Sequence, residues 1–149
     1  MDSRSQIPVF GQRVLNCPCV IRPSAYALVR NPESLIAVVR TPSGCFLPGG
    51  GIERAEDPER AIKREAFEEC GFVVSVVRVV GRAVEIVYSA LEHTCFEKDS
   101  TFAEARLDEA TSEREAGHEL LWLTQSEAVA QLSRGSHRWA VQQLDAVSQ

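Results

Sequence analysis

The segment from Pro48 to Gly71 constrains the fold more than any other part of the chain. Its three consecutive glycines, at positions 49–51, permit a tight backbone path that larger side chains would block. A helix is predicted directly afterwards, over roughly Pro58–Cys70, because Asp57 can cap its start and a proline suits its first position. Gly71 suits the residue just past its end. The segment therefore predicts a glycine turn that runs straight into a capped helix.

This helix carries Glu65, Glu68 and Glu69 at spacings i, i+3 and i+4, which places the carboxylates within an arc of about 100°. Like charges at these spacings repel, so a compensating cation is expected. Arg64 supplies part of it, and Glu56 precedes the helix, close enough to the glycine turn to point at the same end. Together with carbonyl groups of the turn, such an oxygen-rich set suits Mg²⁺ or Mn²⁺. The alternative is a surface helix with solvated acids, which leaves the glycine turn unexplained.

The remaining elements are short periodic segments separated by Gly and Pro, with no repeat or linker between them, as in a single α/β or α+β domain. We therefore expect residues 1–149 to form one domain. Strands are predicted over 25–29 and 35–39 as a hairpin, and over 45–47, 73–80, 83–88, 101–107 and 120–123. Residues 108–119 are predicted to form a charged loop, and 126–132 and 136–147 to form helices.

Charge and hydropathy limit the partners. The net charge of −5 argues against a nucleic-acid coat, which needs clustered positive charge. All basic residues except Lys63 and Lys98 are arginine, whose planar fork suits phosphate oxygens. The first residues lead into no long apolar run, so we expect neither a signal peptide nor a membrane span.

The five cysteines are an odd number, so they cannot all pair within the chain, and a disulfide scaffold is not expected. Reduced thiols in a cytoplasm fit this count better. Cys17 and Cys19 are separated by one residue, which is not the spacing of a zinc knuckle or a redox motif.

Written as a spacing, residues 50–72 are Gly-x5-Glu-x7-Arg-Glu-Ala-x-Glu-Glu-x-Gly-Phe. This resembles the Nudix box, the signature of the Nudix hydrolases, with every fixed position occupied. One small departure is Ala55, where many relatives have glycine. The resemblance implies an α/β/α sandwich with a mixed sheet. It also implies hydrolysis of a nucleoside diphosphate linked to another group, with Mg²⁺ as cofactor and Mn²⁺ as a substitute.

The resemblance also implies roles for the residues of the box. Glu68 and Glu69 would be the core metal ligands, completed by Glu65 and the Gly49 carbonyl, while Arg64 would orient carboxylates through a salt bridge to Glu56. Glu65 is a candidate for the general base, and a carboxylate from a distant loop is the alternative. The carboxylates outside the box are Glu92, Glu97, Glu104, Glu113, Glu115 and Glu119, and the histidines are His93, His118 and His137.

Candidates for substrate contacts lie outside the box. Arg22 and Arg40 could contact phosphates, and Phe46 and Tyr88 could contact a base, although strand ends and core packing explain such residues as well. Tyr88 follows Phe72 by sixteen positions, as in diadenosine polyphosphate hydrolases, whereas position 87 is not the proline usual for ADP-ribose hydrolases.

These observations leave several functions open. A (deoxy)nucleoside triphosphate is the leading substrate, and a dinucleoside polyphosphate is the second. A nucleotide-binding regulatory module without catalysis, and an interaction protein whose acidic helix meets a basic partner, are alternatives from other classes. The complete set of box glutamates favours the enzyme. Family habit makes a homodimer plausible.

Overall fold

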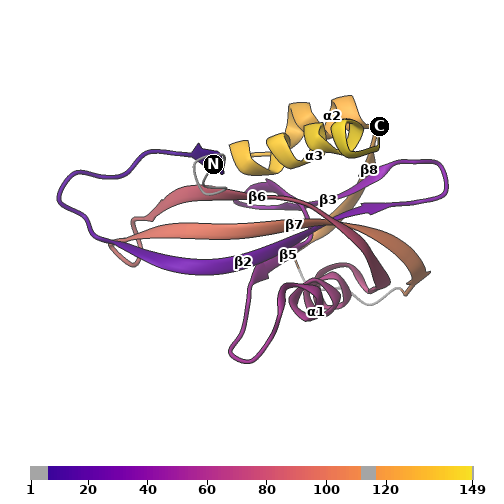
Figure 1. The fold of residues 1–149 in the computed structure, drawn as a ribbon, viewed down its shortest axis with the longest axis horizontal. Coiled ribbons are helices and arrows are strands. Elements are labelled where there is room, and N and C mark those ends of the chain that lie inside the picture. The colour runs from indigo at the N-terminus through magenta and orange to yellow at the C-terminus, as the bar shows by residue number, and fades with distance from the viewer. Residues whose placement is uncertain (1–6, 112–116, 149) are drawn as a thin grey trace.

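The computed structural model describes residues 7–111 and 117–148. A central sheet lies between helices on both faces, with α1 on one face and α2 and α3 on the other (Figure 1). In chain order the elements are β1 (Val9–Phe10), β2 (Cys19–Arg30), β3 (Ile36–Thr41), β4 (Gly44–Phe46), β5 (Gly49–Gly51), α1 (Pro58–Cys70), β6 (Phe72–Ser89), β7 (Thr94–Ala110), β8 (Glu119–Leu123), α2 (Gln125–Gln131) and α3 (Gly135–Ser148). The predicted α/β/α sandwich is confirmed.

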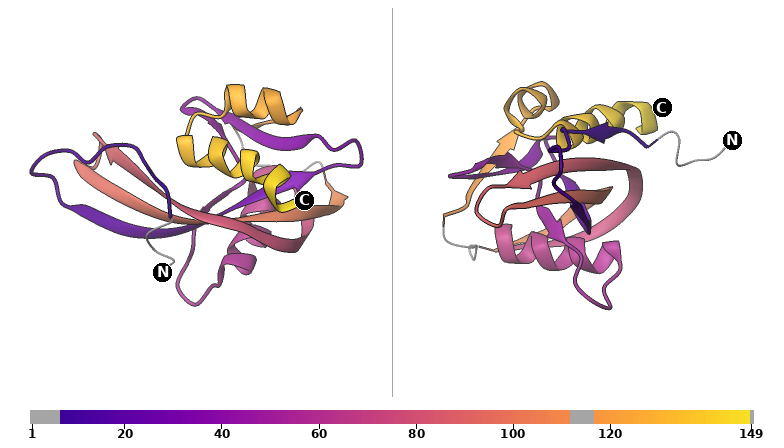
Figure 2. Two further views of the ribbon diagram at one scale, coloured as in Figure 1. Left: turned by 45° about the horizontal axis from the view of Figure 1, so that its top comes forward. Right: turned by 90° about the vertical axis from the view of Figure 1, so that its left-hand side faces the viewer.

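The sheet is mixed, as predicted. Its strands follow the order β1-β6-β7-β2-β3-β4, while β5 pairs with β2 and β8 pairs with β3. The pairs β1/β6 and β2/β7 are parallel, and the other pairs are antiparallel. The long strands β2, β6 and β7 extend beyond the helices at one end of the molecule (Figure 2).

Strand β2 contributes to the core on both faces of the sheet. Because successive side chains point to opposite faces, Tyr26 and Leu28 pack toward α2 and α3, while Ala25 and Ala27 pack toward α1. Burial on both faces explains the run of buried apolar residues from 25 to 29, since a sheet covered by helices on both sides has no polar face.

The boundaries of α1 agree with the sequence prediction. The Asp57 side chain accepts a hydrogen bond from the N–H of Arg60 at 2.8 Å, and Pro58 begins the helix. At the other end, Gly71 has φ of 71°, and its N–H donates to the carbonyls of Ala66 and Phe67. Both ends are therefore set by local sequence.

Two predicted features of the sheet were wrong, and a third, the antiparallel hairpin of β2 and β3, is confirmed only at its turn. The hairpin of β2 and β3 is reduced to the pair Arg30 and Ile36, because β5 lies beside β2 and β3 pairs with β4 and β8. The predicted strands 73–80 and 83–88 form one strand, because β6 stays paired with β7 through a register shift between Val79 and Gly81. Gly81 accommodates Trp139, whose ring would lie 2.8 Å from a Cβ there. Strand β7 is much longer than the predicted strand 101–107, and it includes positions 108–110, which the sequence predicts to begin a charged loop. Positions 112–116 of that predicted loop lie outside the described residues.

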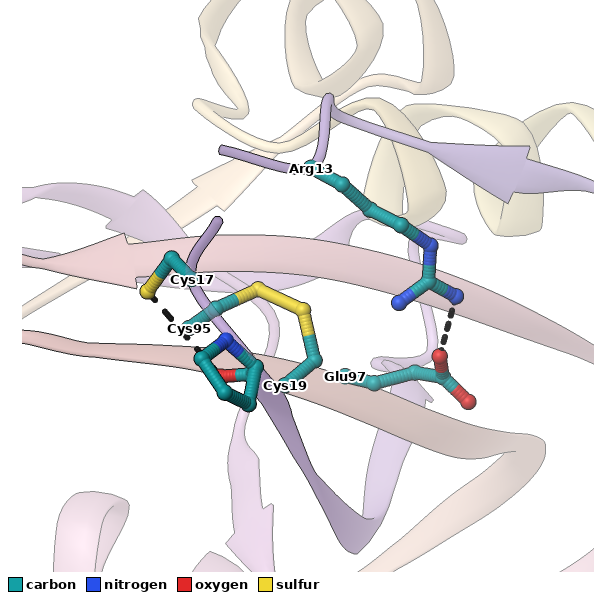
Figure 3. Close-up of a disulfide and its surroundings, with 6 residues drawn as sticks. Arg13, Cys17, Cys19, Cys95 and Glu97 are labelled. Atoms are coloured by element: carbon teal, nitrogen blue, oxygen red, sulfur yellow. Dashed lines mark hydrogen bonds and ion pairs between the residues drawn. A yellow bond between two sulfur atoms is a disulfide. The ribbon is translucent and has the colours of Figure 1, made fainter. Parts of the chain in front are cut away.

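The expectation that all the thiols are reduced was also wrong. Cys19 and Cys95, partners across the parallel pair β2/β7, form a disulfide with their Cα atoms 4.4 Å apart (Figure 3). Arg13 and Glu97 form an ion pair nearby. The partly exposed Cys17 and the buried Cys45 and Cys70 are not part of a disulfide in the ranges that the structure describes. An odd count excludes complete pairing but not a single bond between strands that the fold brings together.

Removing this disulfide is expected to lower the free energy of unfolding. The bond closes a loop across a sequence separation of 76, and loss of the constraint in the unfolded chain costs about 2–4 kcal/mol in typical proteins. Urea unfolding of the double variant Cys19→Ser/Cys95→Ser measures the effect, with Cys17→Ser as a control that keeps the parent value. Dithiothreitol should lower the free energy of unfolding of the parent to that of the double variant. A parent whose free energy of unfolding does not change in dithiothreitol would contradict the prediction.

No helix in the described ranges 7–111 and 117–148 is long and apolar enough to cross a membrane.

Candidate active site

The glycines predicted as a turn form the short strand β5 against β2, and two of them are fixed by close contacts. Gly49 has φ of 151°, and a Cβ there would lie 2.2 Å from the carbonyl oxygen of Ala25. A Cβ on Gly50 would lie 2.9 Å from Oε1 of Glu65. The N–H of Gly49 donates to Oε1 of Glu69 at 2.7 Å. Small residues therefore allow the backbone of β5 to lie directly against the carboxylates of α1.

Arg64 joins the acidic residues into one network. Its Nε donates to Oε2 of Glu56 at 2.8 Å and its Nη2 to Oε1 at 3.0 Å, which is the bidentate arrangement that suits a guanidinium group. Its Nη1 donates to Glu65 at 3.0 Å and to Glu68 at 3.3 Å. Nη2 also reaches the carbonyl oxygen of Gly51 at 3.1 Å. The salt bridge expected between Arg64 and Glu56 is thus present.

The network shifts the acid–base properties of its members. The hydrogen bonds from Arg64, with a smaller contribution from the N–H of Glu53, hold the pKa of Glu56 below its ordinary value. The same bond to Glu56 is the main cause that raises the pKa of Arg64. Both groups stay charged at neutral pH, so the ion pair remains intact there.

The loop before α1 contains Ala55, the position of the box at which many relatives have glycine. Ala55 adopts φ of 71°, in the left-handed region that favours glycine. The sequence therefore holds an alanine at a position where the backbone suits glycine, and the turn that carries Glu56 to the network forms in spite of it.

The predicted box residues Glu56, Glu65, Glu68 and Glu69 all lie at the edge where β5 meets α1. Glu56 and Glu65 are mostly buried, with side chains 16% and 18% exposed, while that of Glu68 is 54% exposed. Within the ranges 7–111 and 117–148, no three Asp, Glu, His or Cys side chains are grouped tightly enough to hold a metal ion without rearrangement.

The distant carboxylates proposed as general bases are mostly engaged elsewhere. Glu97 pairs with Arg13, Glu104 with Arg78, and Glu119 with Arg40. Glu92 is exposed beyond the end of β6, and positions 113 and 115 lie outside the described residues. Glu65, next to the glycine strand, thus stays the strongest candidate from the box.

The four predicted substrate contacts are not brought together. Arg40 is exposed and its Nη2 pairs with Glu119 at 2.7 Å, and Tyr88 is 43% exposed near the end of β6, opposite Cys95. Phe46 lines a cavity beside β5, and Arg22 packs over the ring of Phe96 at 4.7 Å.

The cavity has a volume of about 260 Å³ and lies next to the carboxylate network. Gly49 and Glu69 line it on one side, and Tyr26, Phe46, Lys98 and Arg134 line it as well. Lys98 and Arg134 belong to no motif, so the sequence does not mark them as site residues. The only available signal was the rarity of lysine in an arginine-rich chain.

His137 supports the wall of this cavity from α3. It is buried, and its Nδ1 accepts a hydrogen bond from the N–H of Leu47 at 3.1 Å. Its ring packs against Tyr26, with 4.4 Å between the ring centroids. Burial, followed by the charges of Arg134, Lys98 and Arg138, holds the pKa of His137 well below its ordinary value. His137 is therefore a neutral acceptor that fixes the segment leading into β5.

The folded protein is expected to lose stability as the pH falls below about 6.5, the ordinary pKa of histidine. The unfolded chain then binds a proton at His137 that the folded chain cannot, so the free energy of unfolding falls by up to about 1.4 kcal/mol per pH unit. Urea unfolding at pH 7.5 and 5.5 measures this slope. His137→Phe should make the free energy of unfolding depend less on pH. His93→Asn, which changes an exposed histidine, is the control and should keep the slope of the parent. An equal slope in His137→Phe would exclude this residue as the cause.

Comparison with known proteins agrees with this geometry. A MutT-like protein from Streptomyces ambofaciens is 40% identical over 58 residues, which are 38% of this chain and 38% of that relative. The crystal structure of a MutT protein from Methanosarcina mazei Go1 superposes with a TM-score of 0.70 at 19% identity, covering 91% of this chain and 99% of that one. For an ADP-ribose pyrophosphatase from Streptococcus suis 89-1591 the TM-score is 0.63 at 18% identity, covering 86% and 92%.

These solved structures share the fold of this chain. The sequence match is broader than the box, because the model of the NUDIX domain family matches residues 20–143, from β2 into α3. The chain therefore belongs to the NUDIX domain family.

Proposed function

We propose that this protein is a metal-dependent hydrolase that cleaves the diphosphate linkage of a nucleoside diphosphate derivative. The observation that carries the proposal is the convergence of Glu56, Glu65 and Glu68 on Arg64, directly beside the glycine strand β5. Phosphoryl transfer depends on positioning and charge neutralisation more than on covalent help from the protein. Family membership supports the same reaction class.

Mg²⁺, or Mn²⁺ in its place, fits the donor set. Glu65 and Glu68 already share a single cationic nitrogen of Arg64, at 3.0 and 3.3 Å, so their carboxylates lie close enough to share a cation. All the donors are oxygen atoms, which Mg²⁺ prefers. Glu65, Glu68, Glu69 and the Gly49 carbonyl would hold the ion. When bound, such an ion neutralises phosphate charge and lowers the pKa of a bound water.

The residues of the chain have separate tasks in this proposal. Arg64 holds Glu65 and Glu68 in position, and the bidentate pair with Glu56 fixes Arg64 itself. Glu65, mostly buried next to Gly50, would accept the proton of the attacking water. The N–H of Gly49 orients the Glu69 carboxylate.

We infer that a (deoxy)nucleoside triphosphate is the substrate and that a monophosphate and pyrophosphate are the products. A dinucleoside polyphosphate is the second candidate, favoured by Tyr88, which is 43% exposed and free to contact a second base. A nucleotide-binding module without catalysis is the alternative from another class, and the presence of every box glutamate counts against it.

A panel of nucleotides tests the proposal. Each is incubated with the full chain and Mg²⁺, the products are treated with a coupling phosphatase, and released phosphate is measured. We expect the highest kcat/KM for a nucleoside triphosphate and no activity in EDTA. Turnover of dinucleoside polyphosphates alone would select the second candidate. Binding without turnover of any nucleotide would show a regulatory module and refute the enzyme.

We also propose that residues 1–149 act as one domain, that the protein forms a homodimer, and that it binds neither nucleic acid nor membranes. A cytoplasmic location is supported by Cys17 and Cys45, which form no disulfide in the described residues, whereas the Cys19–Cys95 bond counts against it. Alkylation of thiols in intact cells tests the location, because a cytoplasmic pool should contain Cys19 and Cys95 in reduced form.

A further inference from the structure

The cavity beside β5 gathers positive charge that the proposed reaction leaves unused. Lys98 on β7 and Arg134, just before α3, both line it, together with Glu69 and the glycine strand. Arg22 on β2 is the direct partner of Lys98 in the parallel pair β2/β7. Two cations from separate stretches of the chain therefore line the cavity, and a third, Arg22, lies beside one of them.

These cations differ from most others in the protein because no carboxylate pairs with them. Within the part of the chain that the structure describes, none of Lys98, Arg134 and Arg22 forms a salt bridge. By contrast, seven arginines elsewhere in the described ranges form salt bridges: Arg13, Arg30, Arg40, Arg64, Arg78, Arg82 and Arg106. Unpaired cations that line a cavity are available to an anion that enters it.

The electrostatics show that the cluster is carrying an excess of positive charge. Burial, followed by the charges of Arg134 and Arg22, lowers the pKa of Lys98 to about 8, against a weaker opposing effect of Glu85. Lys98 is still mostly protonated at pH 7. The Glu85 carboxylate accepts the N–H of Ser136 at 2.9 Å, so it is held by the start of α3.

The guanidinium group of Arg134 is held by aromatic side chains. It lies over the ring of Phe46 at 4.8 Å, and its Nη1 is 3.5 Å from the hydroxyl oxygen of Tyr26. His137 fixes Leu47, the neighbour of Phe46, through the hydrogen bond to its N–H. This arrangement leaves the planar fork of Arg134 preorganised for phosphate oxygens.

We propose that this cavity binds phosphate groups of the substrate beyond the diphosphate held at α1, with Lys98 and Arg134 as the residues that contact them. The proposal rests on the proposed function and narrows its substrate class. A nucleoside tri- or polyphosphate carries an anionic group that can reach the cavity, whereas a nucleoside diphosphate linked to a neutral sugar does not. Lys98 and Arg134 therefore set the preference of the enzyme for polyphosphates.

Binding of inorganic tripolyphosphate to the full chain, measured by isothermal titration calorimetry in EDTA, tests the site without turnover. We expect Lys98→Met and Arg134→Met each to weaken binding about 10–100-fold, the effect of losing one charge-assisted hydrogen bond. Arg106→Met is the matched control, because Arg106 is exposed and paired with Asp108, and it should bind as the parent does. Lys98→Met should melt no lower than the parent, since it removes a desolvated cation that other cations repel.

The specificity of turnover gives a second measurement. With Mg²⁺, Lys98→Met should lower kcat/KM for a nucleoside triphosphate about 10–100-fold and leave that for uridine diphosphate glucose within twofold of the parent. Equal tripolyphosphate binding in parent and variants, or no binding by the parent, would overturn the inference even if nucleotides are hydrolysed. Conversely, Lys98-dependent binding without hydrolysis of any nucleotide would leave the cavity assignment standing and refute the proposed function.

Discussion

Glu68→Gln is expected to lower kcat for nucleotide hydrolysis by about a thousandfold, equivalent to ~4 kcal/mol of transition-state stabilisation. The variant replaces one charged oxygen ligand of the proposed metal site with a neutral amide. Because the side chain is 54% exposed and meets the network through a single 3.3 Å contact with Arg64 among the described residues, the fold should be little affected. Steady-state kinetics across a Mg²⁺ titration, together with thermal unfolding, separates the two effects.

Glu59 provides the matched control for this variant. It lies on the same helix with similar exposure, 57%, and its carboxylate is 3.7 Å from Lys63, an exposed pair of the kind worth about 0.3–0.5 kcal/mol. Glu59→Gln should therefore keep kcat within twofold of the parent. If the two variants were equally active, Glu68 would not be a metal ligand and the assignment of the site would fail.

Arg64→Lys is expected to lower kcat/KM about 10–100-fold, the usual cost of losing a group that orients metal ligands. Lysine keeps the charge but cannot bind Glu56 through two nitrogens while also reaching Glu65 and Glu68. Kinetics at saturating Mg²⁺ measures the loss. Arg60→Lys, an exposed change on the same helix, is the control, and parent-like activity in Arg64→Lys would show that Arg64 does not orient the carboxylates.

The same ion pair predicts how stability depends on pH. The folded-state pKa of Glu56 lies below its ordinary value of 4.5, so the pair stabilises the folded protein above that pH. This stabilisation is lost as the pH falls from about 4.5 through the folded-state pKa. Arg64→Met removes the main cause of the shift and should flatten this part of the curve of unfolding free energy against pH, whereas Arg60→Met, which removes only the weakest contribution to that shift, should change it much less.

The features that the sequence predicts best are those that depend on residues close together in the chain. The ends of α1 follow from Asp57, Pro58 and Gly71, each of which acts within one turn of the helix. The position of the carboxylates follows from helical spacing alone, and the salt bridge of Arg64 with Glu56 spans only eight residues.

The features that could not be predicted from the sequence depend on strands that are paired in the sheet but far apart in the chain. Cys19 and Cys95 form a disulfide only because β2 and β7 run side by side, and the same pairing sets Lys98 beside Arg22. No local pattern marks such partners. The break expected near Gly81 is reduced to a register shift for a similar reason, since β6 stays paired with β7 on both sides of that glycine.

The pairing of β2 with β7 also has a consequence for the order of folding. Twelve residue pairs join the two strands, from Cys19 with Cys95 to Arg30 with Arg106, all at the same separation of 76 residues that the disulfide spans. Contacts between distant residues form slowly, because closing the intervening loop costs entropy before any contact compensates for it. Helix α1, with both caps nearby in the chain, can form early. A newly made chain would therefore acquire its carboxylate helix before the cations of the cavity meet.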